Sequence, residues 1–147
     1  MSKTGVFCTG EAPMYAHEGD AGADIRANVT VKLAPGQRKL VGTGLRMALP
    51  DNVVAMVCSR SGLAHKNGVM VVNSPGIIDS GYRGEVMVNL INLGEKTFTV
   101  EPGDRIAQLV ITPFISVHFL PVEEEFFEAA DSFTPRGTSG HGSSGVK

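Results

Sequence analysis

Glycine and proline divide this chain into short segments that favour β-strands. Eighteen glycines and eight prolines are spread over 147 residues, and turn sequences such as Ala34–Gly36 and Glu101–Gly103 separate the apolar runs. Short strands at regular spacing with turn signals between them are typical of a β-sandwich or β-barrel. We predict an all-β fold with one short helix, at Ser61–Lys66. The predicted strands are Val29–Leu33, Arg38–Leu45, Val53–Cys58, Gly68–Val72, Glu85–Asn92, Thr97–Val100, Arg105–Thr112 and Ser116–Leu120.

The length and the net charge of the chain limit the number of domains and the kinds of partner that we expect. A chain of 147 residues, 42% of them hydrophobic, is expected to form one domain with a substantial core. Its formal net charge of −2 gives no reason to expect nucleic acid or a membrane as a direct partner. A polyphosphate ligand would therefore need locally placed arginines and a divalent cation. Because neither a basic-then-apolar leader nor an apolar run of about 18 residues is visible, we expect a cytoplasmic protein.

Several common chemistries have no motif in this sequence. The two cysteines, Cys8 and Cys58, are far apart and have no zinc-ligand spacing. Cys58 ends an apolar run and is interpreted as a core thiol. A Gly-x-x-x-x-Gly-Lys-Ser/Thr loop is absent, which excludes a P-loop nucleotidase. The Gly-x-Ser-x-Gly elbow and the His-Glu-x-x-His motif are absent too.

The segment Arg136–Gly145 combines one arginine, one histidine and several hydroxyls with four glycines. Glycine lets backbone N–H groups come close to an anion, and arginine offers a planar fork of donors to phosphate oxygens. We interpret the segment as a flap that closes over a phosphorylated ligand; a disordered tail is the alternative. The preceding Val122–Ala130, with four glutamates, is interpreted as a surface segment or linker, with phenylalanines available to dock on a neighbour.

Two short clusters are candidates for holding a phosphate and its cation. In Asp20–Ile25, two acids four residues apart among small residues can bring a carboxylate close to a bound cation. A turn before the next strand is the alternative. Ser59–Leu63 follows an apolar run and opens the predicted helix, where free N–H groups, two hydroxyls and Arg60 suit a phosphate. The alternative is a serine that only caps the helix.

A third cluster, Asn73–Gly84, places a carboxylate directly after two isoleucines. That carboxylate, Asp79, loses solvation at the end of a buried run unless it is paired or used, and it can act as a general base toward water. The amide of Asn73 can read a base edge, and Tyr82 can pack on a sugar. A β-hairpin whose aspartate and glycine serve only the turn is the alternative.

A fourth cluster, Pro102–Leu109, brings Asp104 and Arg105 through a turn to the start of a strand. Gln108 is the polar residue inside the apolar run that follows, and a buried amide needs hydrogen-bond partners. The alternative for Asp104 and Arg105 is a structural pair that braces the turn.

Taken together and in this order, these segments resemble the trimeric dUTPases. The resemblance runs from about Asp20 to Gly145 and rests on five motifs: Ala21–Asp24, Ser59–Leu63, Gly76–Gly84, Gly103–Leu109 and Arg136–Gly145. It implies a β-barrel or jelly-roll-like catalytic domain, residues 1–121, and a flexible C-terminal arm, residues 122–147, that carries the flap. It also implies a homotrimer whose active sites are each built from motifs of all three subunits.

The resemblance implies that the protein hydrolyses dUTP to dUMP and pyrophosphate with Mg²⁺, limiting uracil incorporation into DNA and supplying dUMP for thymidylate synthesis. Asp79 would deprotonate the water that attacks the α-phosphorus, and Asp24 would hold water ligands of the metal. Asn73 would read uracil, and Tyr82 would pack on the deoxyribose and leave no room for a 2′-hydroxyl. The other substrate-binding residues would be Arg60, Ser61, Gly62 and Gln108 on phosphate oxygens, Ile78 and Met87 in the pocket, and Arg136, His141, Gly142, Ser143 and Ser144 in the flap, with His141 stacked over uracil.

Two flap positions depart from the family's usual sequence. His141 stands where most members have phenylalanine, and Ser139 stands where glycine is common, so both bear on flap closure. Two other functions remain open. A dCTP deaminase of the same fold has a glutamate ten residues after the aspartate that matches Asp79, where this chain has Asn89. A nucleotide-dependent signalling or binding trimer is the second alternative.

Overall fold

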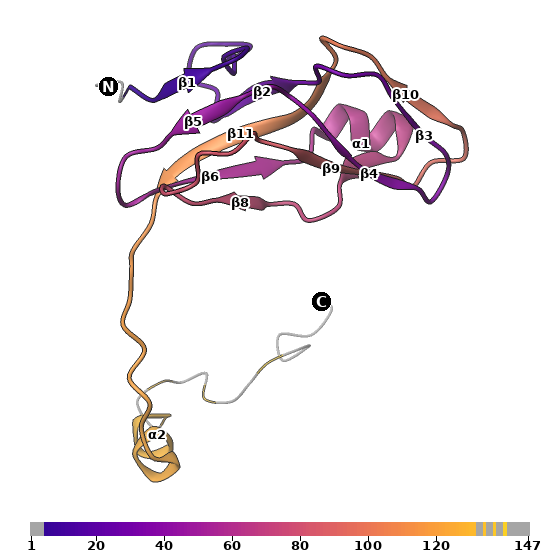
Figure 1. Ribbon diagram of the computed structural model, residues 1–147. Helices are drawn as coiled ribbons and strands as arrows, with labels where there is room; N and C mark the ends of the chain where they lie inside the picture. The colour runs from indigo at the N-terminus through magenta and orange to yellow at the C-terminus, as the bar shows by residue number, and fades with distance from the viewer. Residues whose placement is uncertain (1–4, 132–133, 135–136, 138–139, 141–147) are drawn as a thin grey trace. The chain divides into compact units, whose positions relative to one another are not determined.

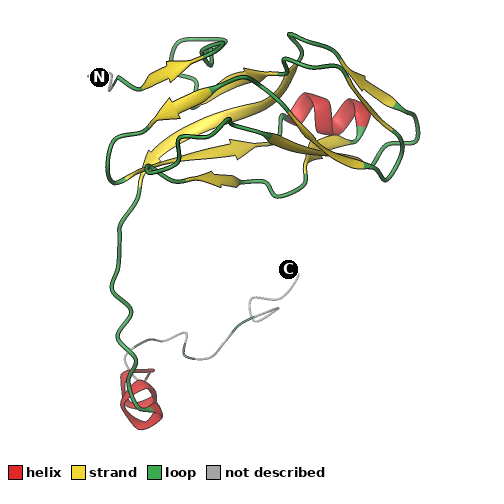
Figure 2. Ribbon diagram, viewed as in Figure 1, coloured by secondary structure: helices red, strands yellow, loops and turns green. Residues whose placement is uncertain are grey.

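The computed structural model describes residues 5–131 together with 134, 137 and 140. Contacts divide these residues into one unit that ends at Ile115 and another that begins at Ser116. Strands and connecting loops make up nearly all of the first unit, which contains one short helix (Figures 1 and 2). This arrangement confirms the all-β prediction.

The first unit contains eleven strands that form antiparallel pairs. They are β1 (Phe7–Thr9), β2 (Gly22–Arg26), β3 (Val31–Leu33), β4 (Arg38–Val41), β5 (Arg46–Ala48), β6 (Val53–Cys58), β7 (Val69–Val71), β8 (Gly76–Ile78), β9 (Val88–Asn92), β10 (Phe98–Val100) and β11 (Arg105–Pro113). One sheet has the order β2-β11-β6-β8 and a second has the order β4-β9-β7; β1 pairs with β5, and β3 pairs with β10.

The core consists of the inward-facing residues of these strands. Burial alternates along β2, β6 and β9, as expected for strands that turn one face to the interior. Branched aliphatic side chains fill the space between the sheets. The largest fully buried aliphatic residues are Leu33, Leu45, Leu90, Ile106 and Leu109. Cys58 is half-buried at the end of β6, so its interpretation as a core thiol was wrong.

The long strand β11 positions much of the site because it pairs on both edges. It lies between β2 and β6, and Gln108 is opposite Asp24 on one side and Cys58 on the other. A register shift between Arg105 and Ala107 interrupts the pairing with β2. Such a bulge re-aims the side chains that follow it.

The predicted helix is present as α1 (Ser61–Asn67), between β6 and β7. Its N-cap residue is Arg60 rather than a serine, and no side chain makes a capping hydrogen bond. The helix ends at Gly68, whose φ of 67° is left-handed and whose N–H donates to the Ala64 carbonyl. A Cβ at Gly68 would lie 2.5 Å from the Gly94 nitrogen, so this close approach requires glycine.

Several predicted elements differ from those observed. The run Arg38–Leu45 ends as a strand at Val41, because the chain turns through Gly44 with a φ of 69°. Strands β1, β2, β5 and β8 were not predicted. Of these, β1, β5 and β8 have three residues each, too few to show an alternation, whereas β2 has five residues and alternates in burial.

The second unit contains α2 (Glu124–Asp131), where the sequence had indicated only a surface segment or linker. Glu124 and Glu125 lie in its first turn, where negative charge is favourable toward the helix dipole. The predicted strand Ser116–Leu120 does not form: no described residue of this chain pairs with it, and Phe119 is 86% exposed. Within the described residues, no helix has the length and apolar character needed to span a membrane.

Candidate active site

The first candidate site is a cavity of about 540 Å³ built by β2, β11 and the start of α1. Among the residues that line it are Asp24, Arg60, Ser61, Gly62 and Gln108. Three of the predicted motifs therefore meet in one place, although Asp24 and Arg105 are 81 residues apart in sequence. Antiparallel pairing of β11 with β2 and β6 is the cause, since it brings the ends of these strands together.

Asp24 lies between two guanidinium groups in this cavity. Its Oδ1 is 2.9 Å from Arg60 Nε, and its Oδ2 is 3.2 Å from Arg105 Nη1. The Asp24 side chain is only 15% exposed, so both pairs are partly shielded from solvent. The two arginines are also linked, because Arg60 Nη1 donates to the Arg105 carbonyl at 2.9 Å. The carboxylate thus holds two cations in a fixed relation while their remaining donors stay available.

Gln108 of β11 lies opposite Asp24 and lines the same cavity. Its Nε2 donates to the Ser59 carbonyl at 2.8 Å, which fixes the amide beside the segment that enters α1. A Cβ at Gly22 would collide with the Gln108 side chain, so glycine at this position makes room for the amide. The prediction that this polar side chain needs a partner is confirmed.

The start of α1 presents backbone donors at the same cavity. The first intrahelical bond is from the Ala64 N–H to the Arg60 carbonyl, at 3.0 Å. The N–H groups of Ser61, Gly62 and Leu63 precede that bond, as at the beginning of any helix. Gly62 has open space around the position of a Cβ. Together with the arginines, these groups form a surface suited to phosphate oxygens.

A second cavity, of about 210 Å³, is formed by β8 and by the β8–β9 loop, residues 79–87. It is lined by Ile77, Ile78, Asp79, Tyr82, Glu85, Val86 and Met87. The Tyr82 N–H donates to the Asp79 carbonyl at 3.0 Å, which closes the turn between them. The β8–β9 loop thus places a carboxylate and an aromatic ring on the same small cavity.

Asp79 is exposed, which corrects the expectation of a carboxylate that follows a buried run. β8 is the edge strand of its sheet, and Ile77 is 58% exposed. The two isoleucines had suggested burial because apolar residues in a strand are usually covered. On this edge strand Ile77 is exposed, whereas Ile78 is partly buried and packs against the core, and Asp79 after them stays open to water.

A family model described as dUTPase matches residues 9–145. The chain belongs to the dUTPase family. It is 47% identical over 148 residues to the deoxyuridine 5′-triphosphate nucleotidohydrolase of Chlamydia felis (strain Fe/C-56), covering 97% of this chain and 99% of the relative. The protein of the same name from Chlamydia trachomatis (serovar D) is 48% identical over 145 residues, with 95% and 97% covered. The chain is an enzyme of this family.

Solved dUTPase structures have the same fold. A Staphylococcus bacteriophage 80alpha dUTPase with dUpNHpp matches with a TM-score of 0.87 at 28% identity, over 98% of this chain and 100% of that one. A dUTPase from phage phi11 of S. aureus, described with a structural Mg(II) ion, matches with a TM-score of 0.76 at 26% identity, over 82% and 98%. The β-barrel or jelly-roll-like subunit expected from the family motifs is therefore confirmed.

The residues that the family motifs nominate fall into separate groups in this dUTPase. Asp24, Arg60, Ser61, Gly62 and Gln108 line the larger cavity, and Ile78, Asp79, Tyr82 and Met87 line the smaller one. The two cavities have no lining residue in common. Asn73 is exposed in the turn before β8 and lines neither of them. Arg136, His141, Gly142, Ser143 and Ser144 lie outside the described residues.

The sequence motifs assigned no binding role to Arg105, which lines the larger cavity. The alternative in which it pairs with Asp104 is wrong, because Asp104 Oδ2 accepts the Glu101 N–H at 2.9 Å while Arg105 reaches Asp24. Residues 105 and 108 would face opposite sides of a regular strand, and the register shift after Arg105 brings both to the cavity. No local pattern in the sequence predicts that bulge.

Proposed function

We propose that the protein hydrolyses dUTP to dUMP and pyrophosphate, and so limits uracil incorporation into DNA and supplies dUMP for thymidylate synthesis. The observation that carries the proposal is the larger cavity, where three family motifs bring Asp24, Arg60 and Gln108 together beside the start of α1. Phosphoryl displacement depends mainly on positioning and on charge neutralisation, and this cavity offers both.

In the proposed complex the larger cavity holds the triphosphate. Arg60 and the backbone N–H groups of Ser61 and Gly62 donate to phosphate oxygens, and the amide of Gln108 adds a further donor. Asp24 keeps Arg60 in place through the 2.9 Å ion pair. Two arginines and two aspartates line this cavity, so their formal charges cancel and a polyphosphate needs a counter-cation.

The residues of the larger cavity fit Mg²⁺ bound mainly by substrate. Among the described residues, no three histidine, cysteine or acidic side chains lie together as a metal cage. Asp24 already binds two guanidinium groups, which leaves it to accept hydrogen bonds from metal-bound water rather than to ligate a bare ion. Mg²⁺ characteristically keeps several waters and binds through few carboxylates and substrate phosphates. When bound, it would supply neutralisation of the phosphate charge.

Asp79 is the proposed general base. Its exposed carboxylate accepts a proton from a water molecule, whose oxygen forms a bond to the α-phosphorus. The bond from that phosphorus to the oxygen that bridges to the β-phosphorus breaks, and pyrophosphate leaves. The adjoining Tyr82, Ile78 and Met87 form the wall for the deoxyribose, and Asn73 reads the uracil edge.

The proposed enzyme is a homotrimer with shared sites. In one chain Asp24 and its two arginines line one cavity and Asp79 lines another. A site that uses both sets is therefore proposed to take Asp79 from a second copy of the chain. The arm, residues 122–147, then carries the flap to a neighbouring site. There Arg136, Ser143 and Ser144 clamp the γ-phosphate, Gly142 allows close approach, and His141 stacks over uracil.

The test is a product analysis of purified protein with Mg²⁺ by anion-exchange chromatography, with dUTP, UTP and dCTP as separate substrates. We expect dUMP and pyrophosphate from dUTP, with little reaction of the other two. Asp79→Asn should lower kcat by about 10²–10⁴-fold, since it removes the base while leaving the phosphate donors in place. Asp51→Asn, an exposed acid outside both cavities, should turn over dUTP at the rate of the parent protein.

Two outcomes would contradict the proposal. Deamination of dCTP would favour the related deaminase chemistry. Tight binding of dUTP without any product would favour the signalling or binding alternative.

A further inference from the structure

Glu85 lies in the β8–β9 loop between Tyr82 and Met87, where it is half-buried and one of its carboxylate oxygens is bound by backbone N–H groups. Glu85 Oε1 accepts two hydrogen bonds from successive backbone N–H groups, at 3.0 Å from the Thr43 nitrogen and 2.8 Å from the Gly44 nitrogen. Two successive N–H groups that converge on one anion form a nest, and bonds to an ionised acceptor are the stronger ones. The β8–β9 loop is thus anchored to the loop between β4 and β5.

Thr43 secures the same junction from the other side. It is only 4% exposed, and its Oγ1 donates to the Val86 carbonyl at 2.6 Å while accepting the Leu45 N–H at 3.1 Å. The Val86 N–H in turn donates to the Leu45 carbonyl at 2.7 Å. Four hydrogen bonds therefore tie residues 85–86 to residues 43–45. We call this set of contacts the Thr43–Glu85 clamp.

The Thr43–Glu85 clamp is connected to Tyr82 of the smaller cavity by the backbone carbonyl of Glu85. The Tyr82 hydroxyl donates to the backbone oxygen of Glu85 at 2.9 Å. The ring lies over Gly84, where a Cβ would be 2.5 Å from Tyr82 Cζ. Since the position of the Glu85 carbonyl decides where the hydroxyl can bind, the clamp decides how the ring stands in the cavity.

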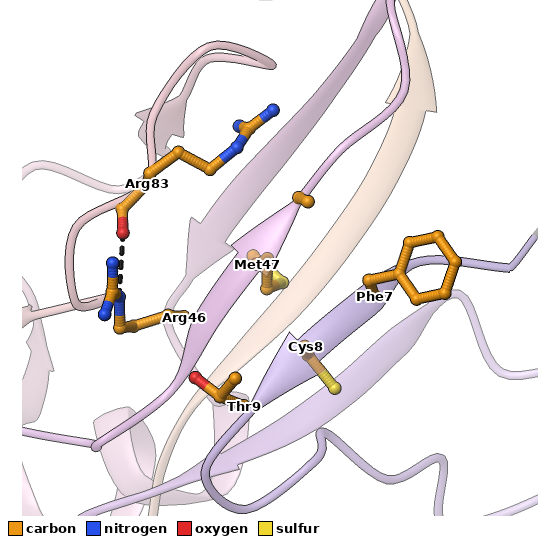
Figure 3. A pocket seen from close by; sticks show the side chains of 7 residues that line it. Phe7, Cys8, Thr9, Arg46, Met47 and Arg83 are labelled. Carbon is orange, nitrogen blue, oxygen red and sulfur yellow. Dashed lines mark hydrogen bonds between the residues drawn. The ribbon is translucent and has the colours of Figure 1, made fainter.

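A residue of β5 also binds the β8–β9 loop. Arg46 Nε donates to the Arg83 carbonyl at 2.8 Å, the bond drawn in Figure 3, while the Arg83 side chain points away from Arg46. Arg83 Nη1 donates to the carbonyls of Ser80 and Tyr82. Asp79 has a different support, because Ile78 just before it pairs with Ala55 of β6. Asp79 and Tyr82 share the bond from the Tyr82 N–H to the Asp79 carbonyl, but Asp79 directly follows a paired strand, whereas the Tyr82 ring also depends on the Glu85 carbonyl.

We propose that Glu85 and Thr43 are positioning residues for sugar selection: the nest fixes the Glu85 carbonyl, the carbonyl fixes the Tyr82 ring, and the ring excludes a 2′-hydroxyl. This inference rests on the proposed function, in which Tyr82 packs on the deoxyribose. Because Asp79 directly follows Ile78, which pairs with β6, loss of the clamp should change substrate selection more than the chemical step.

The test compares kcat/KM for dUTP and for UTP in the full-length enzyme. Glu85→Ala should lower the dUTP:UTP ratio by about tenfold or more, through KM for dUTP and through new turnover of UTP rather than through kcat for dUTP. Glu85→Gln keeps an acceptor oxygen in the nest and should restore most of the ratio. Glu95→Ala, an exposed glutamate outside both cavities, is the matched control and should leave the ratio unchanged.

A double-mutant cycle tests the proposed route. Tyr82→Phe removes the hydroxyl that meets the Glu85 carbonyl, so it should lower the ratio as Glu85→Ala does, and the two changes together should be clearly less than additive. If Glu85→Ala does not fold, Thr43→Val removes the hydroxyl bond to Val86 and replaces Glu85→Ala in the cycle.

The readout separates a positioning role from a structural one. A merely structural clamp would reduce the folded fraction equally for both substrates and leave the ratio intact. A wild-type enzyme that hydrolyses dUTP and rejects UTP, combined with an unchanged ratio in Glu85→Ala, would overturn the inference while leaving the proposed function in place. A wild-type protein inert toward dUTP would overturn the proposed function itself.

Discussion

Asp24 shows how one carboxylate can organise a site without reacting. It neutralises two arginines that would otherwise repel each other, and it holds Arg60 and Arg105 within 3.2 Å of its two oxygens. Without the negative charge of Asp24, the guanidinium groups of Arg60 and Arg105 would repel each other at a position partly shielded from solvent. The geometry of the phosphate donors therefore depends on a residue of the opposite charge.

We predict that Asp24→Asn weakens dUTP binding and lowers the stability of the fold. The amide accepts hydrogen bonds but does not balance the two guanidinium charges, so the free energy of unfolding should fall by about 1–3 kcal/mol. KM for dUTP should rise by about tenfold or more, because Arg60 loses its partner. Urea unfolding and steady-state kinetics measure the two effects; a variant unchanged in both would show that Asp24 does not organise the arginines.

Among the secondary-structure elements, α1 depends most clearly on a single backbone position. Gly68 combines a left-handed conformation with a close approach to Gly94, whereas Gly36, with a φ of 76°, has open space where a Cβ would stand. The two glycines therefore separate the cost of conformation from the cost of a clash.

We predict that Gly36→Ala lowers the free energy of unfolding by about 1–2 kcal/mol, from the left-handed conformation alone. Gly68→Ala should lower it by at least about 1 kcal/mol more, because a Cβ there meets backbone that has no easy way to move. Urea denaturation of both variants gives the comparison. Equal losses would mean that the end of α1 shifts freely to accommodate the methyl group.

Elements with a pattern of their own were predictable from the sequence. The continuous apolar run Val53–Cys58 forms β6 with the predicted bounds, and the Ser-Arg-Ser-Gly sequence opens α1 as expected. The three-residue strands β1, β5 and β8 were not predictable, because each exists through its pairing partner rather than through an alternation of its own. Ser116–Leu120 is the reverse case, a β-prone run without a described partner.

The candidate site was predictable in its residue types and less so in its contacts. The motifs named Asp24, Arg60 and Gln108, which the fold does bring together. The second partner of Asp24 was not predictable, since it depends on the bulge in β11. The exposure of Asp79 was not predictable either, because the edge position of β8 follows from the topology of the sheet.

For the assembled enzyme, shared sites have a consequence that can be measured with mixed subunits. Asp79→Asn and Arg60→Ala should each give an inactive homotrimer, since each removes one half of every site. When the two are refolded together in equal amounts, about a quarter of the sites should receive both native residues and recover activity. Light scattering of the same samples should give the mass of three chains. Mixtures that stay inactive would place both residues of a site in one chain.

The bulge at the start of β11 makes the arrangement of the polar side chains sensitive to the length of this strand. Ahead of it, the turn at residues 101–104 is fixed to the end of β2, because the Ala27 N–H donates to the Asp104 carbonyl and the Gly103 N–H donates to the Ala27 carbonyl. Within the bulge, deletion of one residue would turn either Arg105 or Gln108 to the opposite face of β11. The strands would still pair, and the interior of the barrel would stay intact. Variants with such a deletion would therefore lose phosphate binding while they keep the fold.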